Sequence, residues 1–158
     1  MIKNIGILAV FLAFVFTCPH ANADWRDVKF GDTLSSVEKH DPGSVEISHD
    51  PSDQSQYSIM SGDMILLHHD GYDIDGMKFD VRYSFDQNNK LNSIMLYGDG
   101  SYYNRALMLL SGKYGQPASA NFGHLPQATW ADPAKKTQIK LMRIFGTIIR
   151  YSPQSDRL

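Results

Sequence analysis

The stretch that decides the fold is Met77–Phe85, which reads MKFDVRYSF. Large apolar side chains occupy every second position, and Lys, Asp, Arg and Ser fill the positions between them. Successive side chains of a β-strand point to opposite faces of a sheet. The stretch therefore predicts a strand with one buried face and one face toward water, which is typical of an antiparallel sheet.

Turn residues on either side of this strand indicate that it pairs with its neighbours along the chain. Asn88-Asn89 favours a tight hairpin, because Asn tolerates the positive φ that such a turn needs. The chain then returns as a second strand over Leu91–Tyr97. Further strands are expected over 64–69, 128–131, 137–144 and 147–151, the last two forming a hairpin that turns at Phe145-Gly146.

Two segments carry helical periodicity instead. Thr33 is a suitable N-cap for a short helix that Asp41-Pro42-Gly43 ends. The segment Tyr102–Tyr114 repeats its apolar residues at helical spacing, and Gly115 and Pro117 end it. Strands joined by hairpins together with two helices predict an α+β fold, in which an antiparallel sheet of about five or more strands is packed by two helices as one two-layer domain.

The N-terminal segment Met1–Ala23 has the pattern of a secretory signal peptide. Lys3 precedes an apolar run over Ile5–Phe16, and Ala21-Asn22-Ala23 is a small-x-small cleavage site. Cleavage after Ala23 would leave a single domain over 24–158, with 14 basic and 17 acidic residues and a net charge of −3. This balance excludes a strongly basic nucleic-acid binder, and the apolar run is too short for a transmembrane segment.

The single cysteine, Cys18, lies inside this leader and leaves two hypotheses about anchoring. A lipoprotein would carry its lipid on such a cysteine, but bulky Phe16 fits badly before it. We therefore expect a periplasmic protein released by cleavage, with lipid anchoring as the alternative. A cysteine-free mature chain would depend on its hydrophobic core alone, without disulfides.

The residues that carry chemistry elsewhere in proteins form no catalytic pattern in this sequence. His68 and His69 are neighbours on a predicted strand, so they would point to opposite faces and not chelate one ion. The acidic stretch Asp70–Gly76 departs from the calcium-binding loop at its first and last ligand positions, and is predicted to be a polar turn. We expect no metal, no cofactor and no enzymatic activity, with a metal-dependent hydrolase using His68 and His49 as an alternative.

Aromatic side chains are the remaining signal. Tyr and Trp are frequent anchors of protein interfaces, and Tyr102 and Tyr103 cannot both face inward on one helix. We therefore name Tyr102, together with Asp70, Tyr72 and Asp73 of the predicted turn, as candidate binding residues.

Several motifs resemble a group of small exported bacterial proteins. Trp25 precedes a helix start over Phe30–Val37, a hairpin follows over Tyr83–Leu91, and a helix ends in Leu-x-x-x-Tyr-Gly-x-Pro over Leu110–Pro117. The chain resembles in these motifs the two-layer fold of BamE-type outer-membrane assembly lipoproteins and of β-lactamase-inhibitor-like modules. The resemblance implies binding to other proteins without catalysis.

These observations favour a non-catalytic periplasmic protein-binding module. One version is an inhibitor or immunity protein against a toxin or hydrolase that acts on the envelope, and its partner would be another protein of the periplasm or cell envelope. An envelope or outer-membrane assembly factor is one alternative. A small-ligand carrier, with an apolar pocket between sheet and helix, is another.

Overall fold

The computed structural model describes residues 22–25, 27–50 and 52–154. The predicted signal peptide and Cys18 lie outside this part of the chain, except for Asn22 and Ala23. These two residues begin the first strand, so the predicted cleavage site falls within it. The elements in chain order are β1 (Asn22–Trp25), β2 (Val28–Lys29), α1 (Leu34–His40), β3 (Val45–Glu46), η1 (Gln54–Gln56), β4 (Met64–Ile74), β5 (Met77–Phe85), β6 (Leu91–Gly98), η2 (Gly100–Tyr102), α2 (Tyr103–Tyr114), β7 (Ser119–Asn121), β8 (Gln127–Asp132), β9 (Thr137–Arg143) and β10 (Thr147–Pro153).

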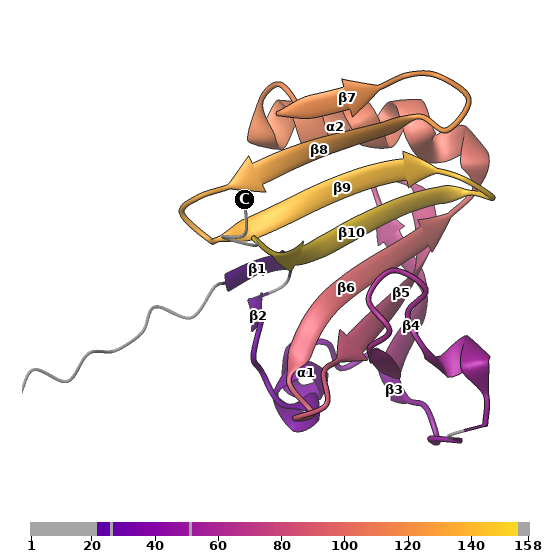
Figure 1. Cartoon of the computed structure of the whole chain (residues 1–158), viewed down its shortest axis with the longest axis vertical. Coiled ribbons are helices and arrows are strands. Elements are labelled where there is room, and N and C mark those ends of the chain that lie inside the picture. The colour runs from indigo at the N-terminus through magenta and orange to yellow at the C-terminus, as the bar shows by residue number, and fades with distance from the viewer. Residues whose placement is uncertain (1–21, 26, 51, 155–158) are drawn as a thin grey trace, which may run out of the picture.

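One antiparallel sheet of eight strands dominates the structure (Figure 1). Its order is β3-β4-β5-β6-β10-β9-β8-β7, and a separate small ribbon joins β1 to β2. The predicted α+β class with an antiparallel sheet is confirmed, and the sheet is larger than five strands. The two edge strands were not predicted, because β3 has two residues and β7 has three, too few to show a period.

The two faces of the sheet have different surroundings. The inner face carries Phe79, Tyr83 and Ile149, which join one core cluster with Val37 of α1 and Leu110 of α2. Both helices therefore lie on the inner face. The outer face carries the alternate residues of the same strands, including Lys78, Asp80 and Arg82 of β5, which are exposed.

The helix boundaries follow the predicted signals. Thr33 caps α1 by accepting a hydrogen bond from the Ser36 amide at 3.4 Å, and α1 ends where the Asp41 amide donates to the carbonyl of Val37. Helix α2 ends at Gly115, whose φ of +82° lies in the region that glycine tolerates best. No helix in the described part of the chain has the length and apolar character to cross a membrane.

The predicted turn over Asp70–Gly76 is wrong in its extent. Strand β4 continues through Asp70 to Ile74 and turns only at Asp75-Gly76, where both residues have positive φ. The apparent break is a β-bulge, since the register to β5 shifts between His69 and Tyr72. Gly71 adopts a φ of +67° there, which lets the strand absorb an extra residue without ending.

Candidate functional site

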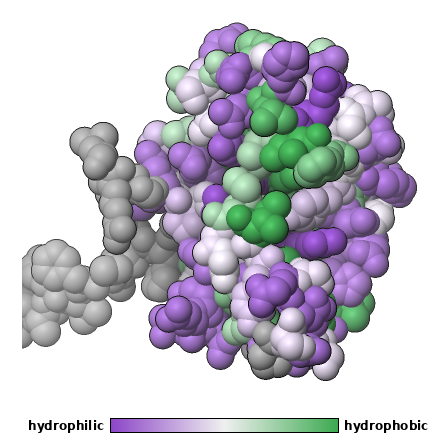
Figure 2. Space-filling view, turned by 45° about the vertical axis from the view of Figure 1, so that its right-hand side comes forward, coloured by the Kyte–Doolittle hydropathy of each residue, from purple (hydrophilic) through white to green (hydrophobic). Residues whose placement is uncertain are grey.

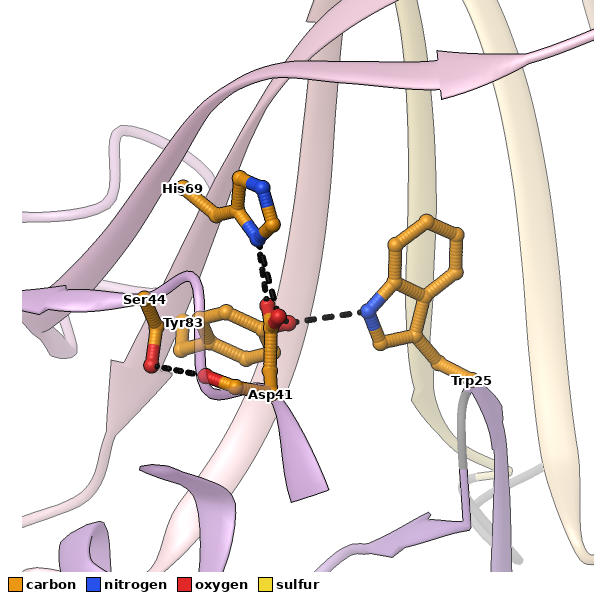
Figure 3. A network of polar contacts seen from close by, with 5 residues as sticks. All are labelled: Trp25, Asp41, Ser44, His69 and Tyr83. Carbon is orange, nitrogen blue, oxygen red and sulfur yellow. Dashed lines mark hydrogen bonds and ion pairs between the residues drawn. The ribbon is translucent and has the colours of Figure 1, made fainter. Parts of the chain in front are cut away.

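A fully buried carboxylate lies at the C-terminal end of α1. Helix α1 ends at Asp41. The side chain of this residue points toward His69 of β4 and Tyr83 of β5, on the inner face of the sheet (Figure 3). Its two oxygens lie 2.8 and 3.0 Å from Nδ1 of His69, and the hydroxyl of Tyr83 donates to Oδ2 at 2.6 Å. An unpaired buried charge costs several kcal/mol, and these hydrogen bonds offset part of the cost of burying the Asp41 carboxylate.

The contacts extend on both sides of the carboxylate (Figure 3). The indole of Trp25 donates to the hydroxyl of Tyr83 at 2.9 Å, and the hydroxyl of Ser44 donates to the backbone carbonyl of Asp41 at 2.7 Å. We call Trp25, Asp41, His69 and Tyr83 the buried network. The buried network connects the N-terminal ribbon, the end of α1 and the neighbouring strands β4 and β5.

Close packing fixes the imidazole in the buried network. A Cβ atom added at Gly43 would lie 2.4 Å from Cε1 of His69, so only glycine fits against this ring. An Asp–His pair orients a general base in many hydrolases. In the described part of the chain, however, the imidazole of His69 has hydrogen bonds only to Asp41, and no serine or threonine hydroxyl is bonded to it. The arrangement can orient the ring, and it includes no hydroxyl nucleophile.

An apolar pocket of about 320 Å³ adjoins the buried network between the sheet and α2. Tyr72 forms part of its wall, with its ring 4.8 Å from that of Trp25 and 5.3 Å from that of His69. We call this space the aromatic pocket. Its lining consists of Trp25, Tyr72, Asp73, Ile74, Met77, Ala106, Leu109, Leu110, Lys113, Ile149 and Tyr151.

The rim of the aromatic pocket is charged. Asp73 accepts from the Gly76 amide at 2.9 Å and lies 3.0 Å from Nζ of Lys78. These contacts, the amide first and the ammonium second, hold the pKa of Asp73 below its ordinary value. In the adjoining turn, Arg105 of α2 donates to Asp75 at 2.6 Å.

On the outer side, four exposed apolar residues lie around the tip of the β9–β10 hairpin. Phe145 is 104% exposed and Ile59 is 82% exposed, and the two line one groove of about 400 Å³. Ile144 precedes Phe145, and the amide of Arg143 donates to the carbonyl of Pro126, which places exposed Leu125 beside them. We call Ile59, Leu125, Ile144 and Phe145 the apolar band. Figure 2 shows apolar side chains gathered down the middle of this side of the molecule, between hydrophilic ones.

The floor of the groove belongs to the outer face of β6 and β10. Tyr97 and Ile148 line it, and the guanidinium of Arg82 lies 4.7 Å from the centre of the Tyr97 ring. Burial raises the pKa of Tyr97 and lowers that of Arg150 on the neighbouring strand. The phenol of Tyr97 and the guanidinium of Arg150 are therefore partly desolvated on the outer face of the sheet.

The structure does not bring the four predicted binding residues together. Tyr72 and Asp73 line the aromatic pocket on the inner side. Asp70 lies on the bulge, 3.1 Å from Nδ1 of His68, and lines a different cavity. Tyr102 packs against Phe79 with ring centres 5.7 Å apart. Tyr72 and Asp73 remain candidates for one site, and the single contact surface expected for all four is not formed.

The histidines lie as the strand alternation predicts. His69 reaches the buried network on the inner face, whereas His68 lines a cavity with Arg82 on the outer one. His49 lies against the ring of Tyr57, with ring centres 6.3 Å apart. Across the described residues, no group of three or more His, Cys, Asp or Glu side chains is placed to hold a metal ion.

The sequence analysis did not predict the buried carboxylate of Asp41 or the exposed ring of Phe145. Asp41 was interpreted only as a helix stop, and nothing local reveals that its carboxylate is buried. Phe145 was interpreted only as part of a turn. A large aromatic residue at a hairpin tip is itself a usable signal, because turns ordinarily carry small or polar residues.

Comparison with known proteins assigns no function to this chain. No protein-family model and no curated protein matches the chain. Among solved structures, the crystal structure of a DUF4309 family protein, YjgB from Bacillus subtilis subsp. subtilis strain 168, is similar with a TM-score of 0.46 and 8% sequence identity. The match covers 77% of this chain and 78% of that chain. A likeness this weak carries over no function.

Proposed function

We propose that this protein is a non-catalytic protein-binding module of the periplasm, and that its partner docks on the apolar band. The observation that carries the proposal is the complete exposure of Phe145 beside Ile59 and Leu125, which are also more than half exposed. Contiguous exposed apolar side chains mark interaction surfaces on small globular proteins. Aromatic side chains are the usual anchors of such surfaces.

The surroundings of the band have the character of an interface rim. Lys78, Asp80 and Asp99 line the same groove as Phe145, so charges of both signs surround the apolar centre. An apolar centre inside a polar rim is the ordinary anatomy of a protein interface. The edge strands β3 and β7 offer only two and three residues for an added strand, so we expect docking through side chains.

The version that we favour is an inhibitor or immunity protein against an envelope-acting toxin or hydrolase. The resemblance to β-lactamase-inhibitor-like modules supports this version, and the resemblance to BamE-type proteins supports an envelope assembly factor as the alternative. Both versions require export, for which the leader over 1–23 is the support. Mass spectrometry of the chain purified from its own cells tests export directly, since cleavage after Ala23 predicts a first residue Asp24.

The binding proposal is tested by affinity capture from envelope extract of the source organism. The bait is the chain purified from cells that express all 158 residues. We expect one partner in stoichiometric amount, and we expect the double variant Ile59→Ser/Phe145→Ser to lose it. A hydrolase or toxin as partner, inhibited on addition of the chain, supports the inhibitor version. Outer-membrane assembly components support the alternative.

Met108→Ser is the matched control for the band variant. Met108 is 68% exposed, but it lies on α2 and therefore on the other side of the sheet. The control removes exposed apolar surface without touching the band, so it should retain the partner. Equal retention by the band variant and wild type, with circular dichroism spectra unchanged, contradicts docking on the band. In that case Tyr72→Ala and Tyr102→Ala test the contact residues predicted from sequence.

A further inference from the structure

We infer that the partner that docks on the apolar band also presents an acidic side chain, which binds between Arg150 of β10 and Lys140 of β9. We call these two residues the cationic pair. The inference rests on the proposed function and adds the charge that the partner carries beside its apolar contact. The cationic pair adjoins the groove, because Ile148 of the groove floor lies two residues before Arg150 on the same face of β10.

The register of the sheet brings the two positive charges together. Arg150 and Lys140 lie directly opposite one another on neighbouring antiparallel strands, and both are half-buried on the outer face. Residues in this arrangement have Cβ atoms about 5 Å apart, and like charges placed in this way destabilise a sheet. The folded chain therefore contains a local charge conflict, which a carboxylate between the two cations would relieve.

The cationic pair has no ion-pair partner in the described part of the chain. Burial lowers the pKa of Arg150 and the charge of Asp63 opposes this shift, but the carboxylate of Asp63 already accepts from the side-chain amide of Asn92 at 2.8 Å. The Nε atom of Arg150 is buried and has no hydrogen-bond partner among the described residues. Natural proteins keep such local conflicts chiefly at functional sites.

Arg82 continues the same line across the sheet, two strands from Arg150, but acidic side chains already surround it. It lines a cavity with Asp53 and Asp70, and Asp80 lies two residues before it on the same face of β5. These carboxylates offset the charge of Arg82. We therefore expect the carboxylate of the partner at the cationic pair and not at Arg82.

The strand geometry also sets the spacing that the partner requires. Residues two apart on a strand are separated by about 7 Å, which is therefore the distance from the apolar floor at Ile148 to the cationic pair. An extended segment of the partner matches this spacing when an apolar and an acidic side chain lie two residues apart on one face. Charge complementarity beside an apolar contact selects the partner and its orientation.

The inference is tested with two peptides that differ in one charge, acetyl-Phe-Ser-Glu-Ser-amide and acetyl-Phe-Ser-Gln-Ser-amide. Each is titrated into the purified chain at low ionic strength, and backbone amide chemical shifts are followed by NMR. We expect the glutamate peptide to bind with a Kd of roughly 1–5 mM, and about threefold more tightly than the glutamine peptide, which is the effect of a surface ion pair. The shifts should include Ile148, Arg150 and Lys140.

Lys140→Gln and Lys90→Gln separate the cationic pair from charge in general. Both substitutions remove one positive charge, but Lys90 lies in the exposed turn between β5 and β6. Lys140→Gln should abolish the difference between the two peptides, and it should raise the melting temperature because it removes the conflict with Arg150. Lys90→Gln should do neither. Equal affinities of the two peptides for wild type, or equal effects of the two substitutions, overturn the inference.

The band variant Ile59→Ser/Phe145→Ser distinguishes this inference from the proposed function. If both peptides bind wild type equally and the band variant loses both, docking on the band is supported and the role of the cationic pair is overturned. If neither peptide binds, the inference fails, and affinity capture from envelope extract still decides the proposed function. Trigalacturonate tests a sugar acid as the source of the carboxylate, and binding at least about tenfold tighter than that of the glutamate peptide overturns the assignment to a protein partner.

Discussion

Strand β5 presents Phe79, Val81 and Tyr83 to the helices, and all three are completely buried. The same strand presents Asp80 and Arg82 to the outer side, where both are exposed. The inner face is covered by two helices and a ribbon, whereas the outer face meets the hairpin tip and the groove around it. Side chains of the same strands are therefore buried on the inner face and exposed on the outer face.

Buried polar groups lie on both faces of the sheet, and on the inner side the hydroxyl of Tyr103 is buried without a hydrogen-bond partner among the described residues. On the inner face the carboxylate of Asp41 accepts from two side chains. On the outer face Ser84 and Ser93 lie opposite one another on β5 and β6, fully buried. In the described part of the chain neither hydroxyl has a hydrogen-bond partner.

Among the substitutions on the two faces, Asp41→Ala should cause the largest loss in the free energy of unfolding. The substitution leaves His69 and Tyr83 without their shared acceptor in a buried place, so we expect a loss of about 3–5 kcal/mol in the free energy of unfolding. The measurement is urea denaturation followed by circular dichroism.

The matched control is Asp70→Ala, which removes the other Asp–His contact found among the described residues. The pair of Asp70 and His68 is exposed to solvent, so we expect a loss below about 1 kcal/mol. If both variants lower the free energy of unfolding by the same amount, the burial of Asp41 does not explain how strongly the buried network stabilises the protein.

Gly146→Ala should have the next largest effect, at the hairpin tip on the outer side. An added Cβ would lie 2.7 Å from the carbonyl oxygen of Gly98, and a backbone atom cannot rotate away. We expect a loss of about 1–3 kcal/mol in the free energy of unfolding. The hairpin tip is therefore closely packed at its backbone, although the side chain of Phe145 beside it is exposed.

Gly112→Ala is the control for that experiment. A Cβ at this exposed position of α2 meets no atom within 4 Å, so alanine should stabilise the helix by about 0.5–1 kcal/mol. Opposite signs for the two Gly→Ala changes support a closely packed tip. Equal signs contradict it.

Ser93→Ala tests a buried hydroxyl on the outer face of the sheet. Its hydroxyl is buried without a hydrogen-bond partner among the described residues, so alanine should raise the free energy of unfolding by about 1 kcal/mol. Thr147 is the inner-face counterpart, because its buried hydroxyl donates to the Asp99 carbonyl at 2.8 Å. Thr147→Val should therefore lower the free energy of unfolding by about 1 kcal/mol. Thermal denaturation of both variants under one condition compares them, and a loss in both would mean that Ser93 does have a partner.

The regular elements were predictable because their signals are local. The alternation over Met77–Phe85 and the cap at Thr33 each use a few neighbouring residues, and the structure confirms both the strand and the helix start. The bulge at Gly71 was not predictable in the same way. A glycine after an aspartate is equally typical of a turn, and only pairing with β5 decides between the two.

The candidate sites were much less predictable, because they join distant segments. Asp41 lies 28 residues from His69 and 42 from Tyr83, so no window of sequence contains the network. The apolar band likewise draws Ile59, Leu125 and Phe145 from three separate segments. Tyr72 and Asp73 are predicted from the sequence as contact residues of a turn, and the structure places them at a pocket that the local sequence does not reveal.

The smallest predicted effect is the dependence of stability on pH from two exposed carboxylates. The Gly76 amide and then Lys78 lower the pKa of Asp73, and hydrogen bonds from Ser101 lower that of Asp99. A carboxylate with a lowered pKa in the folded state stabilises the protein above the ordinary value of 3.8, and this stabilisation is lost as the pH falls through the lower value. The double variant Asp73→Asn/Asp99→Asn should therefore lose less melting temperature than wild type between pH 5 and pH 2.

The dependence on ionic strength shows whether hydrogen bonds or ion pairs produce this difference in melting temperature between wild type and the double variant. The hydrogen bond from Gly76 is the leading cause at Asp73, and hydrogen bonds from Ser101 are the leading causes at Asp99. Added salt screens the attraction between exposed charges but leaves such hydrogen bonds in place. The difference between wild type and the double variant should therefore persist at about 0.5 M salt, where the Debye length falls to only a few Å. If the corresponding difference for the single variant Asp73→Asn disappears in salt, the ion pair with Lys78 rather than the hydrogen bond from the Gly76 amide is the leading cause of the lowered pKa of Asp73.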